Sequence, residues 1–362
     1  MLHSLKTSAS LALLIAWYLA ALPIAAQTQP EITFGAISVL TGEGASWGVN
    51  HQRGIMLAVE EWNQRGGILG RPIAVHFEDS SGGLARNALS AYHRLRAAHG
   101  LRYLLGPVNM DEMLAVVPLA KRDGVFVVAA THLSDAPDNF FSTWIDAEVE
   151  AQRIAQFMAE RHRTIAILSS QQSWELEVSR HIKNHMKKSG GSIVAIEEPS
   201  FEAPEVRSEV LRTKMRRPDA IFISSYYLLP RYLKEIYAQG LRVPVYSIEL
   251  DQAIISASPQ SAAAGLTFIA PQTPKSDFIL RFRKRWQASP DIPAASSYDS
   301  AQILFQHIEK AGGDRKRVAE LYRNFSEHQG VSGMIRREGG KTIVDTAMYE
   351  VRSGVIQKKN LD

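Results

Sequence analysis

Short strand-like runs alternate with longer helical runs through most of this chain. The first pair is Ile32–Leu40, rich in β-branched and aromatic residues, and Gly48–Gln64, whose apolar residues recur at helical spacing. The alternation continues as far as the strand-like run Val243–Ile248. Strands that alternate with helices form parallel sheets joined by right-handed crossovers. The sequence therefore predicts an α/β protein.

The chain is too long for a single hydrophobic core. It has 362 residues, of which 45% are hydrophobic, whereas single cores divide above roughly 250–300 residues. We therefore expect two lobes. Near the C-terminus we expect Gly333–Arg337 and Thr346–Arg352 to pair as a hairpin around Gly339–Gly340.

The first 26 residues have the features of a secretory signal peptide. Lys6 precedes an apolar run from Leu11 to Leu22, and small residues follow, so we expect cleavage near Ala26. The apolar run is shorter than the roughly 20 residues needed to span a bilayer. The chain contains no cysteine, which excludes the lipid-bearing cysteine of a bacterial lipoprotein, disulfides and thiolate metal sites. We therefore expect a periplasmic protein without a lipid anchor.

The charge balance argues against nucleic-acid binding. With 41 basic and 37 acidic residues, the formal net charge is +4, whereas phosphate contacts require a strongly basic face. Without cysteine, thiol nucleophiles are also excluded, and acidic pairs such as Glu60–Glu61 are typical of surface charges. We expect no nucleic-acid partner and no enzyme activity.

His181 and His185 stand four residues apart in a predicted helix, a spacing at which two imidazoles can bind one metal ion. The segment between them supplies no third ligand, and basic neighbours such as Lys183 disfavour a cation. We interpret the pair as a solvated helix face and expect neither a metal site nor a cofactor.

Three glycines, Gly66, Gly67 and Gly70, fall within five residues. A dinucleotide-binding loop follows a strand and opens a helix, but here the glycines follow a predicted helix and precede a strand. We therefore interpret Gly66 and Gly67 as the end of a helix, where the left-handed conformation favours glycine. Ile68 and Leu69 are then expected to be apolar contacts behind the turn.

This turn carries a resemblance to a known family. The stretch NQRGGILGRPI, followed by the strand ending HFEDSSG, is similar to the amino-terminal signature of the branched-chain amino-acid binding protein family. These proteins are type I periplasmic receptors of ABC transporters. Three more segments agree with the family's first strand and binding loop, its third strand and helix, and a late helix: ITFGAISVLTGEGASWG, LLGPVNMDEMLAVVPLAKRDGV and ASSYDSAQILFQHIEKAG.

The resemblance implies a type I periplasmic binding fold, in which two doubly wound parallel-sheet lobes are joined by three crossing segments. A ligand is then held between lobes that close about a hinge. The implied boundaries are 27–146 plus 273–343 for lobe 1 and 147–272 plus 344–362 for lobe 2. The implied crossings lie near Trp144–Ala147, Ala270–Pro274 and Lys341–Met348.

The resemblance also implies ligand-binding positions. It places Trp47 over the ligand side chain, Trp174 at the start of a helix that faces the cleft, and Glu249 where the family's acid receives a ligand ammonium. Tyr226 follows a predicted strand, at the carboxyl end where open α/β sheets bind ligands. We expect these four residues to contact the ligand.

The chain departs from the family where the ligand carboxylate is bound. Family members usually use two serines after a Gly-Pro pair and a threonine after the fourth strand. Here Asn109 and Met110 replace the serines, and either Leu133 or Thr131 takes the threonine's place, depending on the loop length. Asn109 can donate a hydrogen bond or cap the next helix, whereas Met110 only fills space. We therefore expect a best ligand other than leucine, isoleucine or valine.

The sequence thus predicts a monomeric periplasmic protein that captures a small amino-acid-like or aromatic or amide solute for the permease of an ABC importer. The alternative is an extracytoplasmic ligand-sensing or regulatory module with the same clamp.

Overall fold

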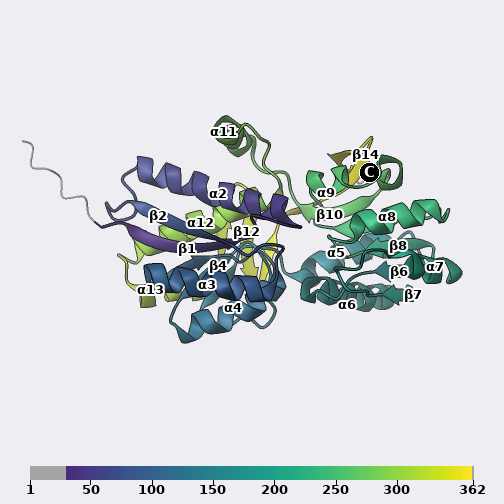
Figure 1. The fold of residues 1–362 in the computed structure, drawn as a ribbon, viewed down its shortest axis with the longest axis horizontal. Coiled ribbons are helices and arrows are strands. Elements are labelled where there is room, and N and C mark those ends of the chain that lie inside the picture. Colours follow the sequence, from purple (N-terminus) through teal and green to yellow (C-terminus); the bar gives the residue numbers. More distant parts are fainter. Residues whose placement is uncertain (1–29, 361–362) are drawn as a thin grey trace, which may run out of the picture.

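The computed structural model describes residues 30–360, so the predicted signal peptide lies outside the described residues. Two α/β lobes follow one another along the longest axis of the molecule (Figure 1). The predicted α/β class and its two lobes are confirmed. Among residues 30–360, no helix is both long and apolar enough to cross a membrane.

Lobe 1 is built on a five-stranded sheet in the order β2-β1-β3-β4-β5, with every neighbouring pair parallel. A separate three-stranded sheet, β11-β12-β13, lies later in the chain. The strands are β1 Ile32–Ser38, β2 Ile73–Asp79, β3 Tyr103–Leu105, β4 Phe126–Ala129, β5 Phe140–Ser142, β11 Glu327–Gln329, β12 Met334–Glu338 and β13 Lys341–Val344. The helices are α2 Ala45–Gln64, α3 Ala85–His99, α4 Met110–Arg122, α11 Ser276–Trp286, α12 Ile292–Lys310 and α13 Arg315–Arg323.

Lobe 2 is built on a seven-stranded mixed sheet in the order β15-β14-β10-β9-β8-β6-β7. Its β6 to β10 strands pair in parallel, and β14 and β15 add an antiparallel edge. The strands are β6 Thr164–Leu168, β7 Ser192–Glu197, β8 Ala220–Ile223, β9 Val245–Ile248, β10 Thr267–Pro271, β14 Thr346–Arg352 and β15 Val355–Lys358. The helices are α5 Ala147–Ala159, α6 Ser173–Lys188, α7 Arg207–Met215, α8 Leu229–Ala238, α9 Gln252–Ser256 and α10 Gln260–Ala263.

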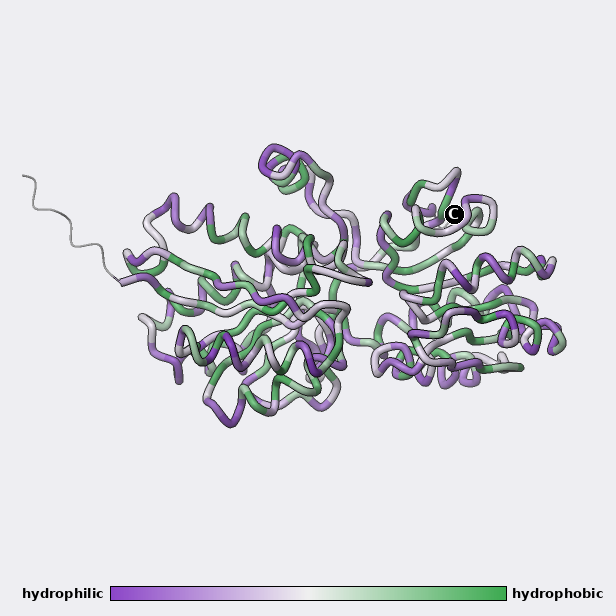
Figure 2. The backbone as a smooth tube through the Cα atoms, in the orientation of Figure 1, coloured by the Kyte–Doolittle hydropathy of each residue, from purple (hydrophilic) through white to green (hydrophobic). Residues whose placement is uncertain are grey.

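The two large sheets are packed on both faces. Successive residues of a strand point to opposite sides of the sheet, so one strand contributes side chains to two hydrophobic cores. In β4, Val128 packs with α2 and α12, whereas Val127 packs with α3 and α4. In β8, Ile221 and Phe222 likewise enter two different cores. Hydrophobic stretches therefore run through the inside of both lobes (Figure 2). A doubly wound sheet brings the carboxyl ends of its parallel strands to one edge.

Three segments join the lobes, between β5 and α5, between β10 and α11, and between β13 and β14. They are hydrogen-bonded to one another: Asp146 N–H donates to Thr342 O at 2.8 Å, and Gln272 N–H donates to Asp345 O at 3.0 Å. Asp146 also caps α5 by accepting from Glu148 N–H. The first crossing therefore leads directly into a lobe 2 helix.

Two details of the chain differ from the sequence predictions. β12 pairs with β13 around Gly339–Gly340, whereas β14 joins the lobe 2 sheet, so the predicted hairpin partner was wrong. The turn after α2 forms as expected, with Gly66 and Gly67 at positive φ and Ile68 fully buried. Leu69, however, is 42% exposed and forms the tip of the turn rather than an apolar contact.

The close packing of α2 on α12 depends on Gly54. A Cβ atom at this position would lie 2.1 Å from the carbonyl oxygen of Ala294. Although glycine is a poor helix former, we expect Gly54→Ala to destabilise the protein by about 1–3 kcal/mol through overpacking. Thermal unfolding followed by circular dichroism measures this. Leu114→Ala, at an exposed position in α4, is the control, and a Gly54→Ala variant as stable as wild type would contradict the packing argument.

Candidate functional site

A cavity lies between the lobes at the carboxyl ends of the parallel strands. Lobe 1 contributes the loops after β1, β3, β4 and β5, and lobe 2 contributes those after β6, β8 and β9. The lining residues are Val39, Gly44, Trp47, Val108, Asn109, Met110, Asp111, Ala130, Thr131, Trp144, Gln172, Trp174, Glu175, Ser224, Tyr226, Tyr227, Ile248 and Glu249.

Most of the residues predicted to bind ligand line this one cavity: Trp47, Asn109, Met110, Thr131, Trp174, Tyr226 and Glu249. Leu133 does not. Its side chain packs in a lobe 1 core and lines a different, polar hollow beside the crossings. Of the two alternatives for the loop after β4, Thr131 is therefore the one that faces the cavity.

Aromatic rings form much of the cavity wall. The ring centroids of Trp47 and Trp144 are 5.8 Å apart, and those of Trp47 and Tyr226 are also 5.8 Å apart, with tilted or edge-on planes. Trp174 packs against hydrophobic cores of both lobes. Aromatic faces carry negative electrostatic potential, so this wall is suited to an apolar or cationic group.

Glu249 is a buried carboxyl group of the cavity. It follows β9 with a backbone φ of +53°, a left-handed conformation that is rare outside glycine. Trp144 Nε1–H donates a hydrogen bond to Glu249 Oε1. Burial raises the pKa of Glu249 to about 7. Burial and the neighbouring Glu249 raise the pKa of Glu150 well above its usual range, so the two carboxyl groups retain a proton near neutral pH.

A second carboxyl group, Glu175, lies on the lobe 2 side. Its Oε1 accepts from the backbone N–H of Tyr226 at 3.0 Å, and its Oε2 accepts from Ser170 Oγ–H. Burial raises the pKa of Glu175 to about 8. Tyr226 in turn donates its hydroxyl proton to Asp251 Oδ2 at 2.9 Å. These bonds fix the Tyr226 ring beside the cavity.

Two acidic side chains, Asp111 and Glu112, lie in the first turn of α4. The backbone N–H of Asn109 donates to Glu112 Oε2 at 3.3 Å. Asp111 Oδ1 accepts from Ser173 Oγ–H of lobe 2 at 2.5 Å, so it also links the two lobes. A helix N-terminus attracts anions, but two acidic side chains in its first turn oppose an incoming carboxylate.

The charged side chains of the cavity are therefore all acidic. Three acidic side chains, Asp111, Glu175 and Glu249, line it, and none of its lining residues within 30–360 is basic. Sequence reasoning missed Trp144, Glu175 and Tyr227 as cavity residues. Glu175 and Tyr227 directly follow predicted site residues, and only the position of Trp144 at an implied crossing pointed toward the cleft.

Gly44-Ala45-Ser46-Trp47-Gly48 matches the G-x-S-x-G pattern of hydrolase nucleophiles. Ser46 lies in the first turn of α2, with Oγ 3.4 Å from Asp251 Oδ2 and 3.5 Å from the hydroxyl of Tyr226. Such a nucleophile requires a hydrogen bond to an imidazole base. Within the described residues, Ser46 Oγ approaches these two oxygen atoms and no imidazole.

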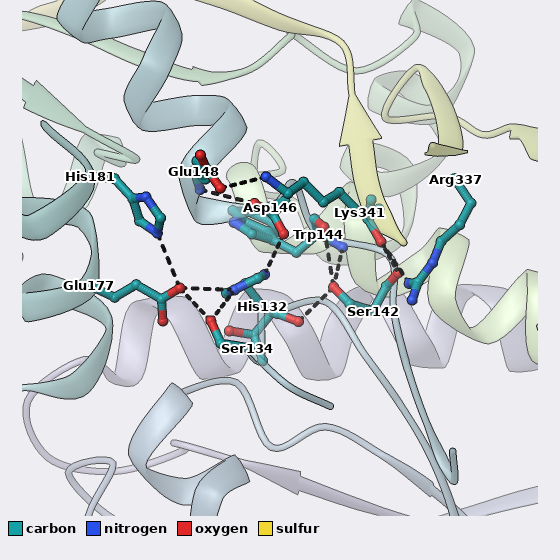
Figure 3. A network of polar contacts seen from close by, with 12 residues as sticks. His132, Ser134, Ser142, Trp144, Asp146, Glu148, Glu177, His181, Arg337 and Lys341 are labelled. Atoms are coloured by element: carbon teal, nitrogen blue, oxygen red, sulfur yellow. Dashed lines mark hydrogen bonds and ion pairs between the residues drawn. The ribbon is translucent and has the colours of Figure 1, made fainter. Parts of the chain in front are cut away.

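A polar network links the lobes beside the crossings (Figure 3). His132 of lobe 1 lies 3.5 Å from Glu177 Oε1 of α6, which also accepts from Ser134 Oγ–H. His181 Nε2 lies 3.6 Å from the same oxygen. The side chains of His181 and His185 are only 10% and 12% exposed, so the interpretation of this pair as a solvated helix face was wrong.

The fold and the cleft define a two-lobed solute-binding protein of the type I periplasmic class. A family model described as periplasmic binding protein matches residues 31–355. The chain belongs to this family, whose members are solute-binding proteins.

Individual relatives agree. A Leu/Ile/Val-binding protein of Rhizobium johnstonii is 24% identical over 364 residues, covering 95% of this chain and 98% of that protein. A Pseudomonas aeruginosa protein that binds leucine, isoleucine, valine, threonine and alanine is 22% identical over 305 residues, covering 78% and 80%.

Two solved structures share the fold. A leucine-binding protein from Thermotoga maritima matches with a TM-score of 0.84 and 19% identity, covering 91% of this chain and 98% of that one. A solute-binding protein of an ABC transporter from Rhodopseudomonas palustris, in complex with 3,4-dihydroxybenzoic acid, matches with a TM-score of 0.79 and 18% identity, covering 89% and 93%. The predicted family, fold and solute-binding role are confirmed.

The hydrogen bond from Trp144 to Glu249 leads to a stability prediction. Trp144→Phe keeps an aromatic ring but removes the N–H donor, so we expect a loss of about 1–3 kcal/mol in the free energy of unfolding. Trp286→Phe is the matched control, because the buried Nε1 of Trp286 has no hydrogen-bond partner among the described residues. Urea unfolding of both variants measures the difference, and equal losses would contradict a specific role for the Trp144 donor.

Proposed function

We propose that this protein captures a small cationic solute that carries an amine and delivers it to the membrane permease of an ABC importer. The observation that carries the proposal is the lining of the cavity, where Asp111, Glu175 and Glu249 face a space with no basic side chain among its described residues. A buried carboxylate is costly unless it is paired. A ligand ammonium supplies that pairing.

The aromatic wall supports the same choice. The rings of Trp47, Trp144 and Tyr226 lie close together, and Trp144 donates a hydrogen bond to the carboxyl group of Glu249. A cation close to a tryptophan or tyrosine face gains about 0.5–2 kcal/mol, with the larger values in desolvated sites. An organic amine, which is both cationic and partly apolar, therefore fits this cavity better than a hydrated metal ion.

Free carboxylates are disfavoured as ligands. The relatives are named for aliphatic amino acids, and the Rhodopseudomonas palustris protein holds an aromatic acid. In this cavity, only neutral donors such as Asn109, Thr131 and Ser224 are available to a ligand carboxylate. Among the amino-acid-like, aromatic and amide solutes expected from the sequence, amines and amino-acid amides are the best candidates.

The rest of the proposal concerns the setting in which the protein acts. We infer that it acts in the periplasm after removal of its signal peptide near Ala26, without a lipid anchor, as a monomer that binds without catalysing a reaction. The family match supports the periplasmic role and the ABC transporter partner. The hydrogen bonds of Ser46, which go to Tyr226 and Asp251 and not to an imidazole among the described residues, support binding without catalysis.

The ligand class can be tested with pairs of amines and their deaminated analogues. We expect thermal-shift screening to select amines, and calorimetry to give weak or no binding of each analogue without the ammonium. Glu249→Gln should weaken binding of the best amine by about 2–5 kcal/mol, because the pair is fully desolvated.

The matched control is Glu198→Gln, since Glu198 is an exposed acid at the end of lobe 2 strand β7 and should leave affinity unchanged. Strongest stabilisation by leucine, isoleucine, valine or an aromatic acid would overturn the proposed ligand class. An unaffected Glu249→Gln variant would remove Glu249 from the site.

The raised pKa of Glu249 predicts a pH dependence of binding. Burial raises this pKa to about 7, although hydrogen bonds with Glu150 and Trp144 and the charge of His132 act in the opposite direction. A cation binds the ionised carboxylate, so below pH 7 binding must first release a proton, and affinity falls by up to tenfold per pH unit.

A quaternary ammonium analogue of the best ligand is the suitable probe, because its own charge does not change with pH. We expect its affinity to rise from pH 5 to about pH 7, and to rise much less in Glu249→Gln. Calorimetry across this range measures both profiles, and a flat profile in the wild-type protein would contradict ionisation of Glu249 on binding.

A further inference from the structure

Outside the ligand cavity, α5 and α6 bring together two imidazoles and a carboxylate. His181 and His185 lie four residues apart on α6, and Glu148 lies in the first turn of α5. One potential ligand atom from each of the three residues lies within 4.8 Å of the other two. We propose that these side chains form a binding site for a zinc-like transition-metal ion.

The chemistry of the three side chains fits this ion. Two histidines and one carboxylate form a common zinc-binding set, with a fourth position left for water. Imidazole also favours borderline transition metals over magnesium or calcium, which prefer oxygen ligands. The i, i+4 spacing places both imidazoles on one face of α6, and the packing of α5 on α6 supplies the third ligand.

The separations between the ligand atoms are close to those of a zinc site. His185 Nε2 lies 3.9 Å from Glu148 Oε1, which is too far for a hydrogen bond. Zinc binds nitrogen and oxygen at about 2.0–2.2 Å, so two ligand atoms of one tetrahedral ion lie roughly 3.3–3.6 Å apart. The ligand atoms here lie within 4.8 Å of one another, so side-chain movements of about 1–1.5 Å bring them to one ion. The imidazoles are 10% and 12% exposed, so they are held in place while Glu148, at 36% exposed, opens the site to solvent.

Two basic side chains compete with the ion. Lys341 Nζ donates to Glu148 Oε2 at 2.5 Å (Figure 3). The other oxygen, Oε1, lies toward His185. Arg180 Nη2 lies 3.0 Å from His181 Nε2, but its side chain is 59% exposed and can turn into solvent. Lys341 is the first residue of β13, the strand that leads into the third crossing. An ion at Glu148 therefore competes with a contact that ties α5 to that crossing.

Zinc titration of the untagged protein tests the site. We expect calorimetry to give one Zn²⁺ per chain, and Co²⁺ to give the visible absorption bands of a low-coordinate nitrogen and oxygen site. His185→Gln and Glu148→Gln should each weaken Zn²⁺ binding about tenfold or more, since even outer-shell changes cost 10–100-fold. Lys341→Gln should instead strengthen binding, because it removes the competing ammonium.

The control for the histidine variants is His99→Gln. His99 stacks on His76 in lobe 1 with ring centroids 3.6 Å apart, so it belongs to a different close pair of histidines. The control for Lys341→Gln is Lys358→Gln on the exposed edge strand β15. Both controls should bind Zn²⁺ like the wild type.

Three results would overturn the proposal: no saturable Zn²⁺ binding to the wild-type protein, unchanged affinity in both His185→Gln and Glu148→Gln, or loss of binding in His99→Gln. Circular dichroism melts show whether each variant is folded. The Co²⁺ spectrum of the wild-type protein provides a measurement that depends on no variant.

Discussion

The hydrogen bond between Trp144 and Glu249 connects the two parts of the molecule on which binding depends. Trp144 belongs to the first crossing between the lobes, and Glu249 directly follows strand β9 of lobe 2. The bond holds a carboxyl group in a place where water is scarce, beside the buried carboxyl of Glu150. Because an unpaired buried charge is unfavourable, the cleft retains protons when no cation is present. One hydrogen bond therefore joins the first crossing to Glu249, the carboxyl group proposed to bind the ligand cation.

The contacts between the lobes surround this centre. Asp111 accepts from Ser173 at one border of the cavity, and His132 lies against Glu177 near the crossings. Ser46 of lobe 1 approaches Asp251 of lobe 2. Each contact joins polar groups that water can also satisfy, so separating the lobes exposes them at modest cost. Such contacts suit a clamp that must open as well as close.

The proposed metal site, formed by Glu148, His181 and His185, also lies beside the crossings. Glu148 follows the cap residue Asp146 at the start of α5, and Lys341 reaches it from β13. The cavity acids line the cleft between the lobes, whereas Glu148 faces the two histidines of α6. Carboxylates thus occupy both sides of the connection between the lobes, in two different chemical settings: one lined by aromatic rings, the other by imidazoles.

The sequence by itself determined the fold class, the order of most strands and helices, and seven of the eighteen cavity-lining residues. Hydrophobic periodicity is a local property, and the carboxyl ends of parallel strands gather at one edge once the class is known. Tyr226 was predicted at the site on this ground, whereas the family resemblance implied Trp47 and Glu249. All three residues line one cavity. The departures at Asn109 and Met110 were equally visible, because they stand at fixed distances from a Gly-Pro pair.

Only the tertiary structure decided the relations that depend on packing. It placed Thr131 rather than Leu133 at the cavity, because loop conformation cannot be counted along the chain. It paired β12 with β13 and sent β14 to the other lobe. It also set Glu148 beside His181 and His185, which the sequence had separated by more than thirty residues. The angle and register at which α5 packs on α6 arise from side chains along both helices, so no local pattern in either one specifies that contact.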